Sequence, residues 1–157
     1  MRARLLLLGM LVAAWGSVGF ALYTQHVWGM LPCPWCVLQR LIFVLIGAAA
    51  LLGLLLAGAS GRRFGGGLAL PLALAGMGTA LWQHFVAAAS ASCNLSMADR
   101  LMGATGLDSR FPEVFAAYAS CGDAKVDLAG VPYELWSLAL FSALALAGWR
   151  VLSRPLP

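Results

Sequence analysis

Four apolar runs, each close to 20 residues long, constrain the fold of this chain more than any other feature. They extend from Leu5 to about Tyr23, from Val37 to Ala57, from Gly67 to Val86 and from Leu135 to about Leu152. A helix needs about 20 apolar residues to cross a hydrocarbon core of about 30 Å. Backbone groups find no water in lipid, so such segments span it as helices. The sequence therefore predicts an all-α integral membrane protein, a four-transmembrane-helix bundle that forms a single membrane domain over residues 1–157.

The composition and the placement of charge support this prediction. Hydrophobic residues make up 62% of the chain and charged residues only 10%, which is more apolar than a soluble domain of this size needs to be. All six acidic residues lie between Asp99 and Glu134. Six of the ten basic residues flank the apolar runs: Arg2, Arg4, Arg62, Arg63, Arg150 and Arg154. Because no basic patch is interleaved with aromatic residues, we expect no nucleic-acid partner.

The basic flanks also predict the orientation. If the chain crosses four times, all of them lie on one side, and the positive-inside rule makes that side cytoplasmic. We therefore expect both termini and residues 60–66 in the cytoplasm, and two outer loops over about 24–36 and 87–134. The alternative is a cleaved signal peptide over residues 1–21, but cleavage would leave three spans and put the remaining basic flanks on opposite sides.

The second outer loop contains one apolar helical pattern. Its members recur at positions 0, 3, 4 and 7: Phe111, Val114, Phe115 and Tyr118. Pro112 suits a first helical turn, and Glu113 suits the positive end of a helix. We expect a short amphipathic helix here, lying on the membrane surface or packed on the bundle.

The four cysteines form two unlike pairs. Cys33 and Cys36 make a C-x-x-C directly before the second apolar run, whereas Cys93 and Cys121 lie in the second outer loop. A C-x-x-C holds two sulfurs close enough to open and close as a redox couple. A widely spaced pair in a loop can reach different partners. In an oxidising compartment we expect two disulfides at rest, Cys33–Cys36 and Cys93–Cys121, with electrons passed from one pair to the other.

Polar side chains are expected at one depth beside the C-x-x-C. Arg40 lies four residues after Cys36, on the same helical face. Its charge and the helix N-terminus would both favour a thiolate at Cys36 over a thiol. An arginine that snorkels to lipid headgroups is the alternative. His84 lies near the outer end of the third run, and Gln25 and His26 close the first. His84 is either an interfacial packing residue or part of a cluster that binds the polar head of a lipid-soluble electron acceptor.

Two other uses of the four cysteines remain open. A non-enzymatic membrane scaffold with two structural disulfides would explain the wide pair, but a C-x-x-C closes too short a loop to stabilise much chain and tends to be labile. A four-cysteine zinc site usually has two C-x-x-C sequences, so we expect no metal. An electron relay needs a strong oxidant. A thiol oxidase has a reduction potential near −120 mV and a structural disulfide one near −300 mV, so passing two electrons from the oxidase into the disulfide is unfavourable by roughly 8 kcal/mol. A membrane quinone would supply that oxidant.

Several of these residues together resemble the DsbB family of bacterial disulfide-bond formation proteins. The resemblance rests on Gln25-His26-Val27, Pro32-Cys33-x-x-Cys36, Arg40, Gln83-His84, the Cys93/Cys121 loop, Phe111-Pro112-Glu113 and Trp136. It covers nearly the whole chain. It implies a multi-pass protein of the bacterial inner membrane that reoxidises a DsbA-like periplasmic thiol oxidase and reduces a membrane quinone, ubiquinone or menaquinone. A thiol–quinone oxidoreductase with a different thiol partner is a near alternative.

The resemblance also implies a role for each cysteine. Cys93 would form the mixed disulfide with the partner, and Cys121 would pair with Cys93 and then exchange with Cys33. Cys36 would present its thiolate to the quinone.

Two further residues would bind that quinone, Arg40 beside the thiolate and His84 near the ring. The chain departs from the pattern at one position: some members carry an acid just before the arginine, where this chain has Gln39.

Overall fold

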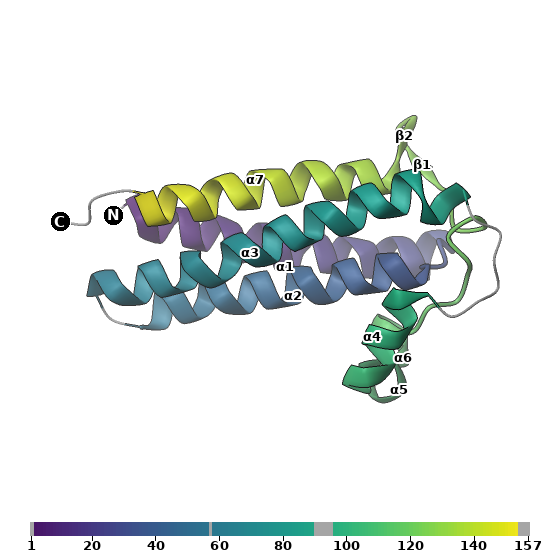
Figure 1. Cartoon of the computed structure of the whole chain (residues 1–157), viewed down its shortest axis with the longest axis horizontal. Coiled ribbons are helices and arrows are strands. Elements are labelled where there is room, and N and C mark those ends of the chain that lie inside the picture. Colours follow the sequence, from purple (N-terminus) through teal and green to yellow (C-terminus); the bar gives the residue numbers. More distant parts are fainter. Residues whose placement is uncertain (1, 57, 90–95, 154–157) are drawn as a thin grey trace.

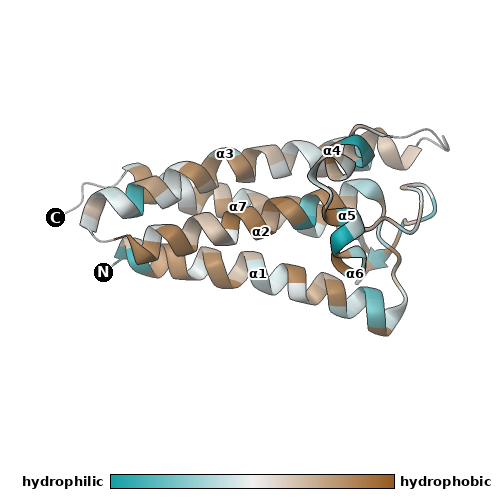
Figure 2. Ribbon diagram, turned by 90° about the horizontal axis from the view of Figure 1, so that it is seen from below, coloured by the Kyte–Doolittle hydropathy of each residue, from teal (hydrophilic) through white to brown (hydrophobic). Residues whose placement is uncertain are grey.

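Four long helices lie side by side in a computed structural model that describes residues 2–56, 58–89 and 96–153 (Figure 1). They are α1 (Arg2–Trp28), α2 (Pro34–Leu55), α3 (Gly58–Phe85) and α7 (Tyr133–Ser153). Each is long and apolar enough to cross a membrane, and Figure 2 shows apolar residues along their whole length. The predicted all-α four-helix bundle is confirmed, and the protein is a multi-pass membrane protein.

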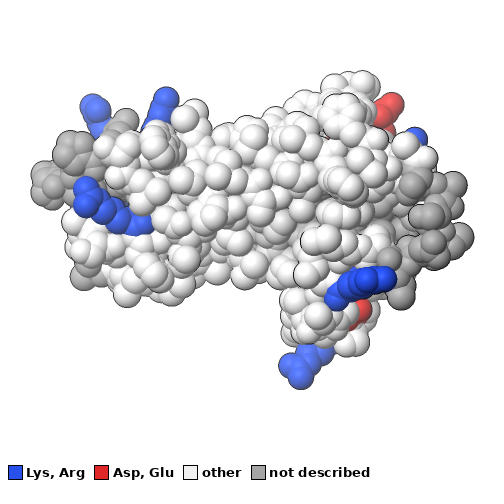
Figure 3. Space-filling view, viewed as in Figure 1, with Lys and Arg blue, Asp and Glu red and all other residues white. Residues whose placement is uncertain are grey.

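The helices pack in the ring order α1, α2, α3, α7, and α7 closes the ring on α1. Both ends of the described chain lie at one end of the bundle (Figure 1). We call it the basic end, because it carries Arg2, Arg4, Arg62, Arg63 and Arg150. We call the opposite end the cysteine end, because it carries Cys33, Cys36 and Cys121. Figure 3 shows basic side chains at both ends of the bundle but, on the visible face, acidic side chains only toward the cysteine end.

The third helix begins at Gly58, so residues 60–66, which were expected to lie before the third span, are part of its helix. The reason lies in close packing by small residues. A Cβ at Gly65 would come within 2.7 Å of the Gly53 Cα on α2, and a Cβ at Gly66 within 2.8 Å of the Val151 Cγ1 on α7. These glycines therefore let α3 approach both neighbours, although in sequence they resemble a flexible linker.

Aromatic packing fills the middle of the bundle. The rings of Phe43 and Phe141 stack with centroids 4.0 Å apart and planes 3° from parallel. Phe141 is fully buried, and Gly76 leaves the space that its ring occupies. This stack joins α2 to α7 directly below the polar groups of the cysteine end.

The second loop folds against the cysteine end through short elements. They are the 3₁₀ turn η1 (Ala87–Ala89), the helices α4 (Met97–Thr105), α5 (Leu107–Arg110) and α6 (Pro112–Phe115), and the strands β1 (Asp127–Leu128) and β2 (Val131–Pro132). The strands form an antiparallel hairpin. Helix α4 starts with a reciprocal cap between Ser96 and Asp99 and ends at Gly106, whose φ is +65°. In Figure 1, α4, α5 and α6 project together to one side of the bundle.

The amphipathic helix expected around Phe111–Tyr118 is present but shorter than the pattern predicted. Helix α6 ends at Phe115, which is buried, and α6 packs on α2. The chain then leaves the helix because the N–H groups of Tyr118 and Ala119 donate to the Pro32 carbonyl, at 3.0 and 3.3 Å. Pairing with the first loop thus replaces the next helical turn, and Tyr118 is exposed.

Candidate active site at the cysteine end

The C-x-x-C forms the start of α2. Cys33 is the N-cap, and its Sγ accepts the N–H of Cys36 at 3.3 Å, while Pro34 occupies the first helical position. Pro is favoured there because its missing N–H needs no partner. The Sγ atoms of Cys33 and Cys36 lie 2.8 Å apart as free thiols. The structure thus holds them within reach of one another, and the Cys33–Cys36 disulfide stays a prediction for the oxidised protein.

Cys121 brings a third sulfur to the same place. Its thiol interacts with that of Cys33 through hydrogen bonding, and the backbone N–H of Trp35 also reaches it. The segment that bonds to Pro32 carries Cys121 to this position, only a few residues after Ala119. Cys33, which is 0% exposed, therefore faces both Cys36 and Cys121. Cys93 lies outside the described residues, so its pairing with Cys121 stays a prediction.

The interaction between these sulfurs has opposite effects on their acidity. Hydrogen bonding with Cys121 and with Cys36, together with burial, raises the pKa of the Cys33 thiol. Hydrogen bonding from Cys33 lowers the pKa of the Cys121 thiol below its usual value, against the opposing effect of burial. Because the thiolate is the nucleophile in disulfide exchange, this difference would suit Cys121 to attack and Cys33 to be attacked.

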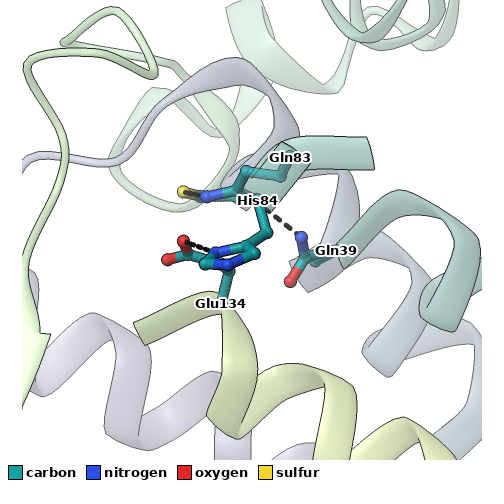
Figure 4. Close-up of polar contacts among 5 residues, drawn as sticks. Gln39, Gln83, His84 and Glu134 are labelled. Carbon is teal, nitrogen blue, oxygen red and sulfur yellow. Dashed lines mark hydrogen bonds and ion pairs between the residues drawn. The ribbon is translucent and has the colours of Figure 1, made fainter. Parts of the chain in front are cut away.

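Two buried amides connect α3 to Cys36 (Figure 4). Gln83 Nε2 donates to the Cys36 Sγ at 3.2 Å, and Gln39 Nε2 donates to Gln83 Oε1 at 2.7 Å. An N–H donated to sulfur favours the thiolate over the thiol. The sequence pattern pointed to His84 at this level, but the neighbouring Gln83 is the residue that reaches the sulfur.

Arg40 is buried in protein and does not extend to the headgroups, since it is only 6% exposed. One guanidinium nitrogen donates to Gln25 Oε1 at 2.6 Å and to the Val114 carbonyl at 3.1 Å, and the other to the Ala21 carbonyl at 3.5 Å. Gln25 Nε2 in turn donates to the Glu113 carbonyl at 3.3 Å. We call Arg40 and Gln25 the Arg40 clamp, because together they tie α1 and α2 to α6.

His84 lies apart from the thiols. Its Nδ1 is 2.8 Å from Glu134 Oε1 in the first turn of α7 (Figure 4). His26, which the sequence placed at the same level, is exposed at the end of α1. Glu134 is the residue that the sequence analysis missed, although an acid in the first turn of a membrane span is itself unusual. A role for His84 in binding an electron acceptor stays a prediction.

A cavity of about 310 Å³ opens beside Cys36 between α1, α2, α7 and the hairpin. Its polar lining includes Cys36, Gln39, Arg40, Gln83, Tyr133 and Glu134. Its apolar lining includes Val18, Phe20, Leu31, Phe43, Trp136 and Leu140. Because Phe20 is 43% and Trp136 48% exposed, the cavity reaches the outer face of the bundle. Its volume and its mostly apolar wall with convergent polar groups are typical of a small-molecule site.

Within residues 2–56, 58–89 and 96–153, no group of three or more Cys, His, Asp or Glu side chains could hold a metal ion. The three described cysteines approach each other as a row of thiols beside a cavity. That arrangement suits disulfide exchange, because each sulfur has a neighbouring sulfur to attack or to release. The expected absence of a metal stays a prediction.

Comparisons with known proteins agree with this chemistry. Residues 3–151 match the family described as "Disulfide bond formation protein DsbB". A disulfide bond formation protein B of Aromatoleum aromaticum is 35% identical, with 96% of this chain and 93% of that protein covered. That of Ralstonia nicotianae is 37% identical over 86% of this chain and 84% of its own length. That of Nitrosospira multiformis is 34% identical, with 90% and 86% covered. The chain therefore belongs to the DsbB family of disulfide bond formation proteins.

Proposed function

We propose that this protein is a membrane thiol–quinone oxidoreductase. It would oxidise the reduced cysteine pair of a DsbA-like periplasmic thiol oxidase and pass two electrons to ubiquinone or menaquinone in the membrane. The observation that carries the proposal is the order of groups at the cysteine end. Cys121 faces Cys33, Cys33 faces Cys36, and Cys36 lines a cavity that opens on the outer face of the bundle.

The exchange begins at the loop pair. A thiolate of the partner attacks Cys93 of the Cys93–Cys121 disulfide, so that a mixed disulfide forms and Cys121 leaves as a thiolate. The lowered pKa of Cys121 suits this leaving role. The assignment of Cys93 rests on the family resemblance, and on its being the one other cysteine of the chain.

The next step moves the reducing equivalents to the C-x-x-C. The Cys121 thiolate attacks the Cys33 Sγ, a Cys33–Cys121 bond forms, and the Cys33–Cys36 bond breaks to release Cys36 as a thiolate. The second thiolate of the partner then displaces Cys93, and Cys93 displaces Cys33 from Cys121. The partner and the loop pair are now disulfides, while Cys33 and Cys36 together hold the two electrons.

The last step returns the C-x-x-C to its oxidised form. Cys33 and Cys36 rejoin as a disulfide, and two electrons and two protons pass to the acceptor. A bound quinone supplies that acceptor chemistry. The lining of the cavity supports such a ligand, because apolar walls suit a ring and tail while Arg40 can stabilise negative charge beside Cys36.

The proposed orientation follows from the charges. The basic end would face the cytoplasm, with both termini, and the cysteine end would face the periplasm of the bacterial inner membrane. On the visible face the basic end carries basic side chains and no acidic ones, whereas the cysteine end carries both, and this difference supports the orientation (Figure 3). A membrane-impermeant thiol reagent should label single-cysteine variants of Cys121 in spheroplasts, and should not label a cysteine placed at Arg63.

The experiment combines purified protein, a reduced thioredoxin-fold oxidase and ubiquinone, with quinone reduction followed by absorbance. We expect quinone loss that matches the formation of partner disulfide in a ratio of one to one. The Cys121→Ser variant is the matched control and should show neither. Oxidised cysteines in the wild-type protein without any quinone loss would instead support a scaffold with two structural disulfides.

A further inference from the structure

The cavity beside Cys36 contains one carboxylate among the described residues that line it. That residue is Glu134, which is 8% exposed and lies in the first turn of α7. The neighbouring polar groups Gln39 and Gln83 are amides, which do not release protons. An acceptor reduced here by two electrons must also take up two protons. The cavity therefore needs a proton donor that these amides cannot provide.

Glu134 has a connection from the cavity toward water. Its Oε1 lies 2.8 Å from His84 Nδ1, and the His84 side chain is 31% exposed where that of Glu134 is 10% exposed. His84 is absent from the cavity lining, while Glu134 is part of it. The pair thus has one member inside the cavity and the other at the surface of the cysteine end.

We propose that Glu134 is the proton donor for acceptor reduction and that His84 recharges it from water. This inference rests on the proposed function. The reduced Cys33–Cys36 pair gives up two electrons as its disulfide forms and the acceptor gains them, while the Cys33 proton leaves to water and Cys36, already a thiolate, has none to release. Glu134 delivers one proton to the acceptor, takes another through His84 and delivers that one too. The two protons balance those that the partner's thiols release to water when they are oxidised.

The other titratable groups that face the cavity are less suited to this role. Cys36 is consumed as the electron-donating thiolate, and an arginine such as Arg40 does not release its proton in proteins. Tyr133 shares a hydrogen bond with Thr24. Thr24 is 2% exposed, so that bond leads into the bundle and away from water.

The first test measures two steps separately in Glu134→Gln, which keeps the shape of the side chain and an acceptor oxygen for His84. Quinone reduction should slow by about 100-fold, the usual scale of general acid catalysis, and its solvent deuterium isotope effect should rise. Formation of the Cys33–Cys121 disulfide should stay within about twofold of wild type, because it needs no proton in the cavity. Glu134→Asp should recover much of the rate. Asp127→Asn, which removes an exposed acid from the neighbouring hairpin, should match wild type.

The second test needs no quinone. With ¹³C-labelled glutamate, the infrared carboxyl band that disappears in Glu134→Asp, where position 134 no longer carries the label, reports the Glu134 carboxyl. On transfer to D₂O this band should shift quickly in wild type and at least about tenfold more slowly in His84→Phe. Equal exchange in the two proteins would overturn the relay. This comparison of wild type with His84→Phe remains decisive even if Glu134→Gln does not fold.

Different results would refute the proposed function and the proton role of Glu134. Wild-type protein that never reduces quinone would refute the proposed function. Wild-type protein that reduces quinone, beside a Glu134→Gln variant as fast as Asp127→Asn, would refute only the proton role of Glu134.

Discussion

The two ends of the bundle are packed by different means. Toward the basic end, helices meet through glycines, with Gly65 against Gly53 and Gly66 against Val151. Toward the cysteine end, polar side chains fill the space between the helices. All the buried polar or charged residues of the described chain lie there: Thr24, Gln25, Gln39, Arg40, Gln83 and Glu134. One end is thus held by close contact of backbones and the other by a hydrogen-bonded network.

The buried polar groups of the cysteine end carry an energetic cost that the glycine contacts of the basic end do not. Burying a polar group in a membrane protein is unfavourable unless it is hydrogen-bonded, and among the described residues no buried side-chain nitrogen or oxygen lacks a partner. The glycine contacts join α3 to α2 and to α7 without such a network. We infer that the network is kept for chemistry at Cys36, and changes at the two ends should therefore have separable effects.

The largest effect is expected from Cys36→Ser. Serine cannot form the disulfide or carry the electrons, so turnover should fall to the rate seen without protein. The fold should persist, because Cys36 is only partly buried and contributes little to the core. Steady-state oxidation of the partner measures the first result and thermal unfolding the second. Residual turnover well above background would mean that another group faces the acceptor.

Arg40→Ala should have the next largest effect. Loss of hydrogen bonds from a buried charge costs about 1.5–3 kcal/mol, so the quinone concentration needed for half-maximal turnover should rise by about 10- to 100-fold. Arg40→Lys should recover only part of this, because lysine lacks the planar fork. A pull-down of the partner through Cys93 should be unchanged. Normal quinone dependence in Arg40→Ala would restrict Arg40 to holding α6.

Gln25→Ala should have a smaller and more selective effect. It removes the neutral hydrogen bond to the Glu113 carbonyl, worth about 0.5–1.5 kcal/mol. It also removes the oxygen that accepts from Arg40, whose guanidinium keeps its bonds to the Val114 and Ala21 carbonyls. The Cys33–Cys121 disulfide should form about 2- to 10-fold more slowly, because α6 holds the segment that leads to Cys121. Quench-flow alkylation and peptide mapping measure this rate. If only quinone binding changes, the clamp does not position the loop.

The smallest effect on chemistry is expected at the basic end. Gly65→Ala forces a Cβ against the backbone of Gly53 and should cost about 1–3 kcal/mol of stability. Turnover per folded molecule should be unchanged. Gly16→Ala is the matched control, because its Cβ would meet no atom within 4 Å. A fall in the specific activity of Gly65→Ala would show that the two ends are coupled.

Much of the fold could be predicted from the sequence, because hydrophobic length alone identifies four spans. The beginning of α3 could not, since Gly61, Gly65 and Gly66 look like a linker until their neighbours are known. In the second loop, Ser96 and Asp99 form a capping pattern that marks α4, and this signal was overlooked. The early end of α6 depends on pairing with Pro32, a contact distant in sequence.

The depth of the site residues in the membrane could be predicted from the sequence, but the direction of each side chain could not. The sequence placed Arg40, His84 and the C-x-x-C at one height in the membrane. It could not show that Gln83 points to Cys36 while His84 points to Glu134, because adjacent residues on a helix differ by about 100° in direction. The contact of Cys121 with Cys33 likewise depends on how the two loops cross.

Disulfide mapping can show whether Cys33 exchanges between Cys121 and Cys36. In the double variant Cys36→Ser, Cys93→Ser, the two cysteines left are Cys33 and Cys121. Mild oxidation followed by peptide mass spectrometry should find them joined in nearly all molecules. The matched variant Cys33→Ser, Cys93→Ser should give far less of the Cys36–Cys121 bond. Free Cys33 and Cys121 thiols in the first variant, or an equal yield of disulfide in both variants, would mean that Cys33 is not the residue that exchanges with Cys121.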